Sequence, residues 1–299
     1  MDIWVVVAGA LVGFVVGLTG MGGGALMTPI LVLVFGVTPL TAVSSDLLAA
    51  LVMKPIGGGV HIRKGTVHTP VVRWLVIGSV PSAFLGAVIL DVMAGPDFAE
   101  RMKIFLGATL IIASSAIALR AMLGRRREKS VIDTSIPMSL RAQVRPFPTL
   151  CIGVFGGLIV GLTSVGSGSL MIVGLMLLYP GLTTSELVGT DLVQAIPLVG
   201  AAALGHLLFG SVEFGLTFAL LIGGIPAVWF GARLSSRAAN SFVRPALMSV
   251  LLLSGIKLVG GSNGVLLAGV VISVIAVISM SRRGAIADPV ELEKLEPVR

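Results

Sequence analysis

The chain has 299 residues, of which 56% are hydrophobic and 12% are charged, with a formal net charge of +7. Soluble domains carry about 25% charged residues, so this composition excludes an ordinary soluble protein. The apolar runs lack the two-residue alternation of barrel strands, which favours an all-α polytopic membrane protein. Most basic residues gather in short segments between apolar runs, as in cytoplasmic loops, which argues against nucleic-acid binding.

The predicted spans begin close to the N-terminus. Apolar runs that approach the roughly 17–25 residues of a spanning helix lie at Ile3–Leu18, Leu75–Leu90, Ile104–Leu119, Leu216–Phe230 and Val265–Met280. The first run follows neither a basic segment nor a signal cleavage site, so we expect it to remain as a span. Cys151 is the single cysteine, which excludes an intrachain disulfide.

The sequence contains an internal repeat. Gly17–Met27 (GLTGMGGGALM) aligns with Gly161–Met171 (GLTSVGSGSLM), 144 residues later (17 to 161). Further matched pairs lie 145 residues apart (46 to 191): Asp46 and Asp191, His61 and His206, Pro81 and Pro226. We predict a first transmembrane repeat over 1–123, a basic cytoplasmic linker over 124–148 and a second repeat over 149–260. An additional transmembrane helix over 261–283 and a polar tail over 284–299 follow.

Basic residues occupy different loops in the two repeats. The first repeat has a basic loop at Arg63–Arg73, Arg120 precedes the linker, and Arg125–Arg127 lie within it. In the second repeat the loop equivalent to Arg63–Arg73 has no Lys or Arg, and the next loop is basic instead. This shift predicts inverted repeats. Inversion requires a broken, re-entrant first segment in each half, at 3–36 and 148–180; a parallel duplication is the alternative.

The two glycine motifs are the main candidates for a substrate site, because broken helices at matching positions mark such sites in transporters. The candidates are Thr19, Gly22, Gly23 and Gly24 in the first copy and Thr163, Gly166, Ser167, Gly168 and Ser169 in the second. Amide groups freed where a helix restarts would favour an anion. Close helix packing through small residues is the alternative explanation. The serines of the second copy predict a site with two unequal sides.

Three further polar residues and one cation interrupt apolar runs. Asp46 and Asp191 are candidates for coupling to a proton or a cation; if Thr41 and Thr184 were the caps, they would be helix-terminal acids instead. Gln194 is a neutral candidate for the same cavity. Lys54 lies beside Pro55 and either offers a positive charge to an anion or extends toward the nearby basic loop.

The duplicated pattern resembles the TauE/SafE family of membrane transporters, also described as sulfite exporters. The resemblance covers roughly 10–260. The residues that carry it are Gly17–Gly24, Pro29, Ser44–Leu47, His61, Gly65–Val67 and Gly86–Ala87, with Val188–Leu192, Gly205–His206, Gly210–Val212 and Gly231–Leu234 in the second copy. It implies transport of small anions, with sulfite, sulfonates and related sulfur compounds as the usual substrates.

Together these features predict a secondary transporter that moves a small anion across the cell inner membrane. A passive anion channel is the alternative. An intramembrane enzyme is disfavoured, because HExxH and recognisable nucleophile motifs are absent from the sequence. The matched histidines lack the spacing of metal ligands and are interpreted as polar anchors at helix ends. We expect a small anionic substrate and membrane lipid as partners, without nucleic acid, metal or cofactor; a homo-oligomer is compatible with the sequence.

Overall fold

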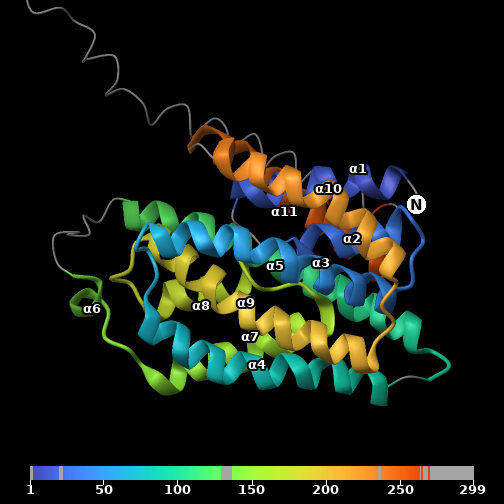
Figure 1. Cartoon of the computed structure of the whole chain (residues 1–299), viewed down its shortest axis with the longest axis horizontal. Coiled ribbons are helices and arrows are strands. Elements are labelled where there is room, and N and C mark those ends of the chain that lie inside the picture. Colours follow the sequence, from blue (N-terminus) through green and yellow to red (C-terminus); the bar gives the residue numbers. More distant parts are fainter. Residues whose placement is uncertain are drawn as a thin grey trace, which may run out of the picture.

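The computed structural model describes residues 3–19, 23–93, 95–128, 137–234, 237–262, 264 and 269. All named elements in this part of the chain are helices (Figure 1). The first half contains α1 (Ile3–Thr19), α2 (Gly24–Leu33), α3 (Pro39–Arg63), α4 (Thr69–Val92) and α5 (Phe98–Glu128). After the single turn α6 (Met138–Arg141), the second half contains α7 (Pro146–Thr163), α8 (Leu170–Leu178), α9 (Thr184–Phe209), α10 (Phe214–Leu234) and α11 (Arg237–Leu258).

Six helices of the described part are long and apolar enough to cross a membrane: α3, α4, α5, α7, α9 and α10. Their outer faces carry large apolar side chains that the protein leaves uncovered, among them Phe155 and Phe218. Such faces are stable against the hydrocarbon core of a lipid bilayer, whereas in water they would promote aggregation. The prediction of an all-helical, multi-pass membrane protein is therefore confirmed.

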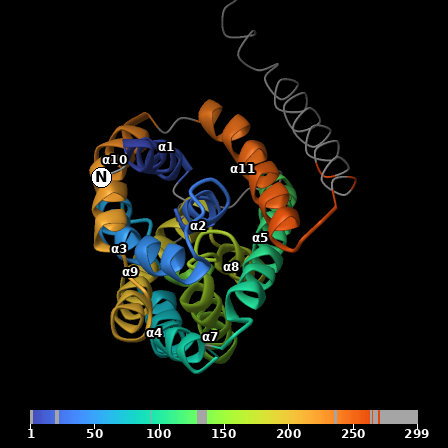
Figure 2. The ribbon, with the colours of Figure 1, turned by 90° about the vertical axis from the view of Figure 1, so that its right-hand side faces the viewer.

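Both glycine motifs interrupt helices. α1 ends at Thr19 and α2 begins at Gly24, while α7 ends at Thr163 and α8 begins at Leu170. At 1.5 Å per residue, α2 and α8 are only about 15 Å long, half of the roughly 30 Å hydrocarbon core. Figure 2 shows these two short helices inside a ring formed by the longer ones. The glycine motifs therefore lie in the middle of the bundle.

The two halves pack against each other reciprocally. α1 lies along α10, and α7 lies along α4. Glycines permit this approach: a Cβ on Gly9 would lie 2.7 Å from the carbonyl oxygen of Leu220, and one on Gly153 would lie 2.5 Å from that of Leu75. Gly9 and Gly153 are repeat partners, as are Leu75 and Leu220. Small residues at helix contacts thus explain part of the glycine content.

The boundaries of the predicted segments differ slightly from the helix ends. α5 continues to Glu128, beyond the predicted end of the first repeat at 123, and α7 begins at Pro146, before the predicted start at 149. Gly22, the linker residues 129–136 and the tail 284–299 lie outside the described residues, as does nearly all of the predicted additional helix 261–283.

Candidate functional site

Asp46 and Asp191 lie deep inside their helices. α3 is capped by Thr38 and α9 by Thr183, so each aspartate is the eighth residue of its helix. Their side chains are 0% and 1% exposed. A helix-terminal acid is stabilised only within the first turn. The interpretation of these residues as first-turn acids capped by Thr41 and Thr184 is therefore wrong, because both helices begin earlier than that interpretation requires.

Asp46 binds two hydroxyl groups through one of its carboxylate oxygens. Ser164 Oγ donates to Asp46 Oδ2 over 2.7 Å, and Thr28 Oγ1 donates to the same oxygen over 3.0 Å. Oδ1 is buried and accepts no hydrogen bond from any described residue. Ser164 has a left-handed backbone conformation, with φ of 60°, which is uncommon for a residue other than glycine. Asp46 therefore joins α3 to α2 and to the loop between α7 and α8.

Asp191 has a different set of partners. Gln194 Nε2 donates to Asp191 Oδ1 over 3.1 Å, and the backbone amide of Gly168 also bonds this carboxylate. Ser79 Oγ in turn donates to Gln194 Oε1 over 3.2 Å. The charges of Lys54 and Arg120 attract Asp191. Gln194 thus serves Asp191 as a hydrogen-bond donor, and the two repeat-related carboxylates are inequivalent.

Lys54 turns into the protein. Its side chain is buried, and Nζ donates to Ser167 Oγ over 2.6 Å. Its charge also acts on Asp46 and Asp191. The alternative in which Lys54 extends to the basic loop is wrong, because the polar partners that its ammonium needs lie inside the bundle. The repeat partner of Lys54 is Val199, so this cation belongs to one half only.

Arg120 is a buried cation, although the sequence suggested that it belongs with the basic residues of the cytoplasmic loops. It lies on α5, it is 4% exposed, and its Nη1 donates to the carbonyl oxygen of Gly168 over 3.0 Å. One signal could have identified it: the apolar residues Ala121–Leu123 separate Arg120 from Arg125. That spacing places Arg120 about a turn inside the span.

Four buried charged side chains therefore converge on one loop, residues 164–169. Asp46 accepts from Ser164, Lys54 donates to Ser167, and Arg120 and Asp191 bond the carbonyl and the amide of Gly168. When all four groups are ionised, two negative and two positive charges sum to zero. Sequence reasoning also missed Ser164, Thr28 and Ser79 as members of this cluster, because nothing in the repeat distinguishes them from other small residues of the spans.

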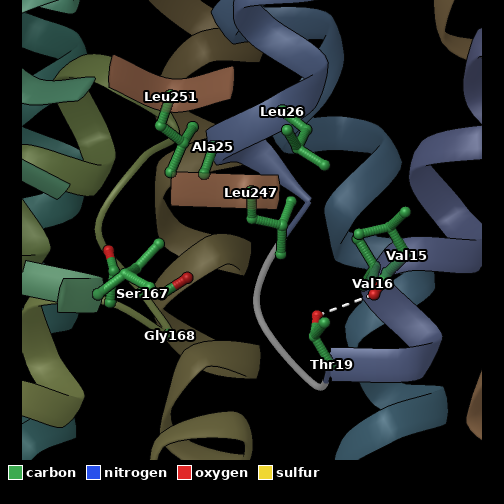
Figure 3. Close-up of a pocket in the computed structure, with 11 residues that line it drawn as sticks. Val15, Val16, Thr19, Ala25, Leu26, Ser167, Gly168, Leu247 and Leu251 are labelled. Carbon is green, nitrogen blue, oxygen red and sulfur yellow. Dashed lines mark hydrogen bonds between the residues drawn. The ribbon is translucent and has the colours of Figure 1, made fainter. Parts of the chain in front are cut away.

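A pocket lies between the two glycine motifs (Figure 3). The cavity itself is small, with a volume of about 20 Å³, and it opens into a wider region toward the surroundings. Its polar lining comes from Thr19 on one side and from Ser167, Gly168 and Ser169 on the other. Valine, alanine, leucine and isoleucine side chains of α1, α2, α5 and α11 form the rest of the wall. Four of the predicted site residues therefore share one cavity.

The hydroxyl groups around this pocket differ in their availability. Thr19 Oγ1 donates to the carbonyl oxygen of Val15 over 2.8 Å, and Thr163 Oγ1 donates to that of Ile159 over 2.7 Å. Ser169 Oγ is buried and has no hydrogen-bond partner among the described residues. An unpaired buried hydroxyl is costly unless a ligand or water satisfies it. Ser169 is thus the lining group that most needs a partner.

The glycines of the motifs have local structural roles. Gly166 and Gly168 have φ of 126° and 87°, values that L side chains rarely adopt, and Gly24 packs against the backbone of Ser164. The carbonyl oxygen of Gly166 accepts from the amides of Leu170 and Met171, and that of Gly23 accepts from the amides of Leu26 and Met27. The expectation that the restarted helices leave their amides free therefore fails for these four groups, because the motifs cap the new helices themselves.

The matched histidines are hydrogen-bonded at helix ends. His206 is fully buried; its Nδ1 pairs with Ser44 Oγ and its Nε2 pairs with the carbonyl oxygen of Gly161, each over 2.7 Å. His61 Nδ1 pairs with Thr66 Oγ1 over 2.8 Å. Both residues lie in the last turn of their helices, where an imidazole that bonds a neighbouring element anchors the helix end.

Comparison with known proteins identifies the family. The model of the family described as "Sulfite exporter TauE/SafE" matches residues 5–258. The chain belongs to the TauE/SafE family. It is 38% identical to the probable membrane transporter protein YjnA of Bacillus subtilis (strain 168), a match that covers 87% of this chain and 100% of YjnA.

Other relatives of this family are more distant. The probable membrane transporter proteins YtnM and YdhB of Bacillus subtilis (strain 168) are 29% and 24% identical. Each match covers 81% of this chain, together with 76% of YtnM and 96% of YdhB. No solved structure matches the chain. The family and the names of these relatives indicate a membrane transporter rather than an enzyme.

Proposed function

We propose that this TauE/SafE protein is a secondary transporter of a small anion, such as sulfite, a sulfonate or a related organic anion. The anion binds in the pocket between the two glycine motifs. The observation that carries this proposal is the hydrogen bond from Lys54 Nζ to Ser167 Oγ, 2.6 Å long, because Ser167 also lines the pocket. The buried ammonium group of Lys54 therefore contacts a residue that the anion would also contact.

The polar lining supports the same conclusion. Ser169 offers an unpaired hydroxyl, and Ser167 receives a hydrogen bond from an ammonium group, which leaves its own proton available to donate. Hydroxyl donors backed by a positive charge stabilise oxyanions. Asp46 and Asp191 lie behind the loop rather than among the lining residues, so their negative charges are one layer removed from the anion.

Alternating access follows from an inverted repeat, which we propose for this chain. The reciprocal packing of α1 on α10 and α7 on α4 supports it. So does a pair of repeat-related hydrogen bonds: the Glu213 amide donates to Ser45 Oγ over 3.2 Å, and the His68 amide donates to Thr190 Oγ1 over 3.0 Å. In this scheme α1–α2 and α7–α8 are re-entrant hairpins, and one half rocks against the other around the pocket.

Exchange of labelled anions in proteoliposomes tests the proposal. Purified protein is reconstituted with unlabelled sulfite, ethanesulfonate, methanesulfonate or acetate inside, and uptake of the same labelled anion is followed. We expect saturable exchange of at least one of the first three anions, and its loss in Lys54→Met. Lys64→Met is the matched control, since it removes an exposed lysine at the end of the same helix. Background flux for every anion, or flux that never saturates, would contradict a carrier.

A further inference from the structure

We infer that Asp46 takes up one proton whenever the transporter binds one monovalent anion, so that the two cross the membrane together without net charge. This inference rests on the proposed function and assigns its coupling residue and stoichiometry. It follows from the charge balance of the buried cluster and from the unequal hydrogen bonding of the two aspartates.

The four buried charges of the cluster balance one another. Asp46, Asp191, Lys54 and Arg120 are each at most 8% exposed, and their charges cancel when all four are ionised. An anion in the adjacent pocket would add a negative charge to a low-dielectric interior, where an unbalanced charge is expensive. One proton on a carboxylate of the cluster restores neutrality. An empty carrier and a carrier loaded with anion and proton are then both neutral, and both can reorient.

The hydrogen bonds select Asp46 over Asp191. Both donors to Asp46, the hydroxyls of Ser164 and Thr28, reach Oδ2, while Oδ1 has no partner among the described residues. A proton can therefore be added to Oδ1 without breaking a hydrogen bond. Asp191 instead accepts one hydrogen bond from the Gln194 side-chain amide and another from the Gly168 backbone. These two donors stabilise its negative charge.

The groups facing Asp46 are consistent with this assignment. Lys54, on the same helix, supplies the cationic charge that acts on it. α9 contributes Asp191, whose charge is shared between Lys54 and Arg120 of α5, and His206, which bonds Ser44 rather than the carboxylate. Before α10, the amide of Glu213 bonds Ser45, and the Glu213 side chain is exposed. α2 and the 164–169 loop contribute the two hydroxyl donors.

The loop links the proton to the anion. Ser164 holds Asp46 at one end of the 164–169 loop, and Ser167 and Ser169 line the pocket toward the other end. Ser164 combines a left-handed backbone with the hydrogen bond from its hydroxyl to Asp46. A protonated Asp46 is a weaker acceptor than a carboxylate, so proton uptake loosens the segment that contacts the anion.

The test is uptake driven by a pH gradient. Proteoliposomes containing full-length protein are given labelled ethanesulfonate outside, because this anion keeps a single negative charge at every pH used; methanesulfonate is measured alongside it. With the outside about one pH unit more acidic, electroneutral coupling of one proton to one anion predicts about tenfold accumulation. A potassium diffusion potential set with valinomycin should leave that accumulation unchanged.

The variants separate coupling from transport. Asp46→Asn imitates a permanently protonated side chain, so we expect measurable exchange but no accumulation under the gradient, and Asp46→Glu should restore part of the accumulation. Glu213→Gln, which removes an exposed carboxylate outside the cluster, is the matched control and should still accumulate the anion in proportion to its exchange rate. Accumulation by Asp46→Asn, or a response of wild-type accumulation to the membrane potential, overturns the inference while leaving transport intact. Absence of wild-type exchange removes the proposed function itself.

Discussion

Lys54 and Ser167 come from opposite halves of the chain, and their side chains meet in the interior, with Nζ 2.6 Å from Oγ. Their repeat partners are Val199 and Gly23, neither of which has a polar side chain. The contact therefore has no counterpart at the repeat-related positions. It distinguishes the second glycine motif from the first and makes the pocket polar on one side.

Ser167→Ala should weaken anion binding. The substitution removes a pocket hydroxyl and leaves Lys54 without its hydrogen-bond acceptor, and hydrogen bonds to charged groups contribute about 1.5–3 kcal/mol, or roughly 10–100-fold in affinity. The half-saturation concentration in the exchange assay measures the change. Ser115→Ala is the control, because Ser115 is exposed and its hydroxyl bonds the backbone of its own helix. An unchanged half-saturation concentration for Ser167→Ala would show that the contact between Lys54 and Ser167 does not contribute to anion binding.

Asp191 and Arg120 should compensate each other in stability. Removal of one charge from a buried set leaves the other uncompensated and costs about 3–5 kcal/mol, whereas removal of both restores neutrality. We expect Arg120→Met and Asp191→Asn each to lower the thermal unfolding temperature of detergent-solubilised protein. The double variant should be more stable than either single one. Additive losses in the double variant would show that these two charges are not coupled.

Gly153 and Gly59 should respond in opposite ways to alanine. A Cβ on Gly153 would lie 2.5 Å from the backbone carbonyl oxygen of Leu75, whereas a Cβ on Gly59 would have no atom within 4 Å. Gly153→Ala must therefore push α4 and α7 apart and destabilise the protein. Gly59→Ala should be neutral or stabilising, by up to about 1 kcal/mol, because alanine favours the helix. Thermal unfolding of the two variants under identical conditions measures the difference, and equal effects would contradict the described α4–α7 contact.

A buried and an exposed ion pair should differ in their contribution to stability. Arg141 and Glu186 are about 10% exposed and 2.6 Å apart, and Glu186 also completes the N-terminal capping box of α9. Arg101 and Asp97 are 3.6 Å apart and largely exposed. Arg141→Met should cost several times more than Arg101→Met, which is expected to change the free energy of unfolding by less than about 1 kcal/mol. Equal losses in a chemical-denaturation series would refute this ranking.

The sequence predicted the class of fold and the positions of both helix breaks. The long apolar segments follow from the bilayer, and glycine-rich strings are the poorest helix formers in such segments. The repeat also identified Asp46 and Asp191 as a pair. These features depend on local composition and on the register between the two copies, and both can be read directly from the amino-acid sequence.

The partners of the charged residues could not be predicted in the same way. A sequence shows that Lys54 and Arg120 lie on helices, but it does not show which neighbouring helix faces them. Both were therefore open to interpretation as residues near a loop, and in the structure both are buried against the 164–169 loop. The engaged amides of the glycine motifs are a second case, because the positive φ of Gly166 turns its carbonyl toward the start of α8.

The packing of helices from one half against helices of the other half affects the order in which the fold can assemble. α1 is complete at Thr19, yet the helix that covers its glycine-lined face, α10, begins only at Phe214. The face of α1 that packs against α10 therefore acquires this partner only after most of the protein has been synthesised. The first half alone cannot bury the surface that Gly9 presents, and its assembly is completed only by the second half.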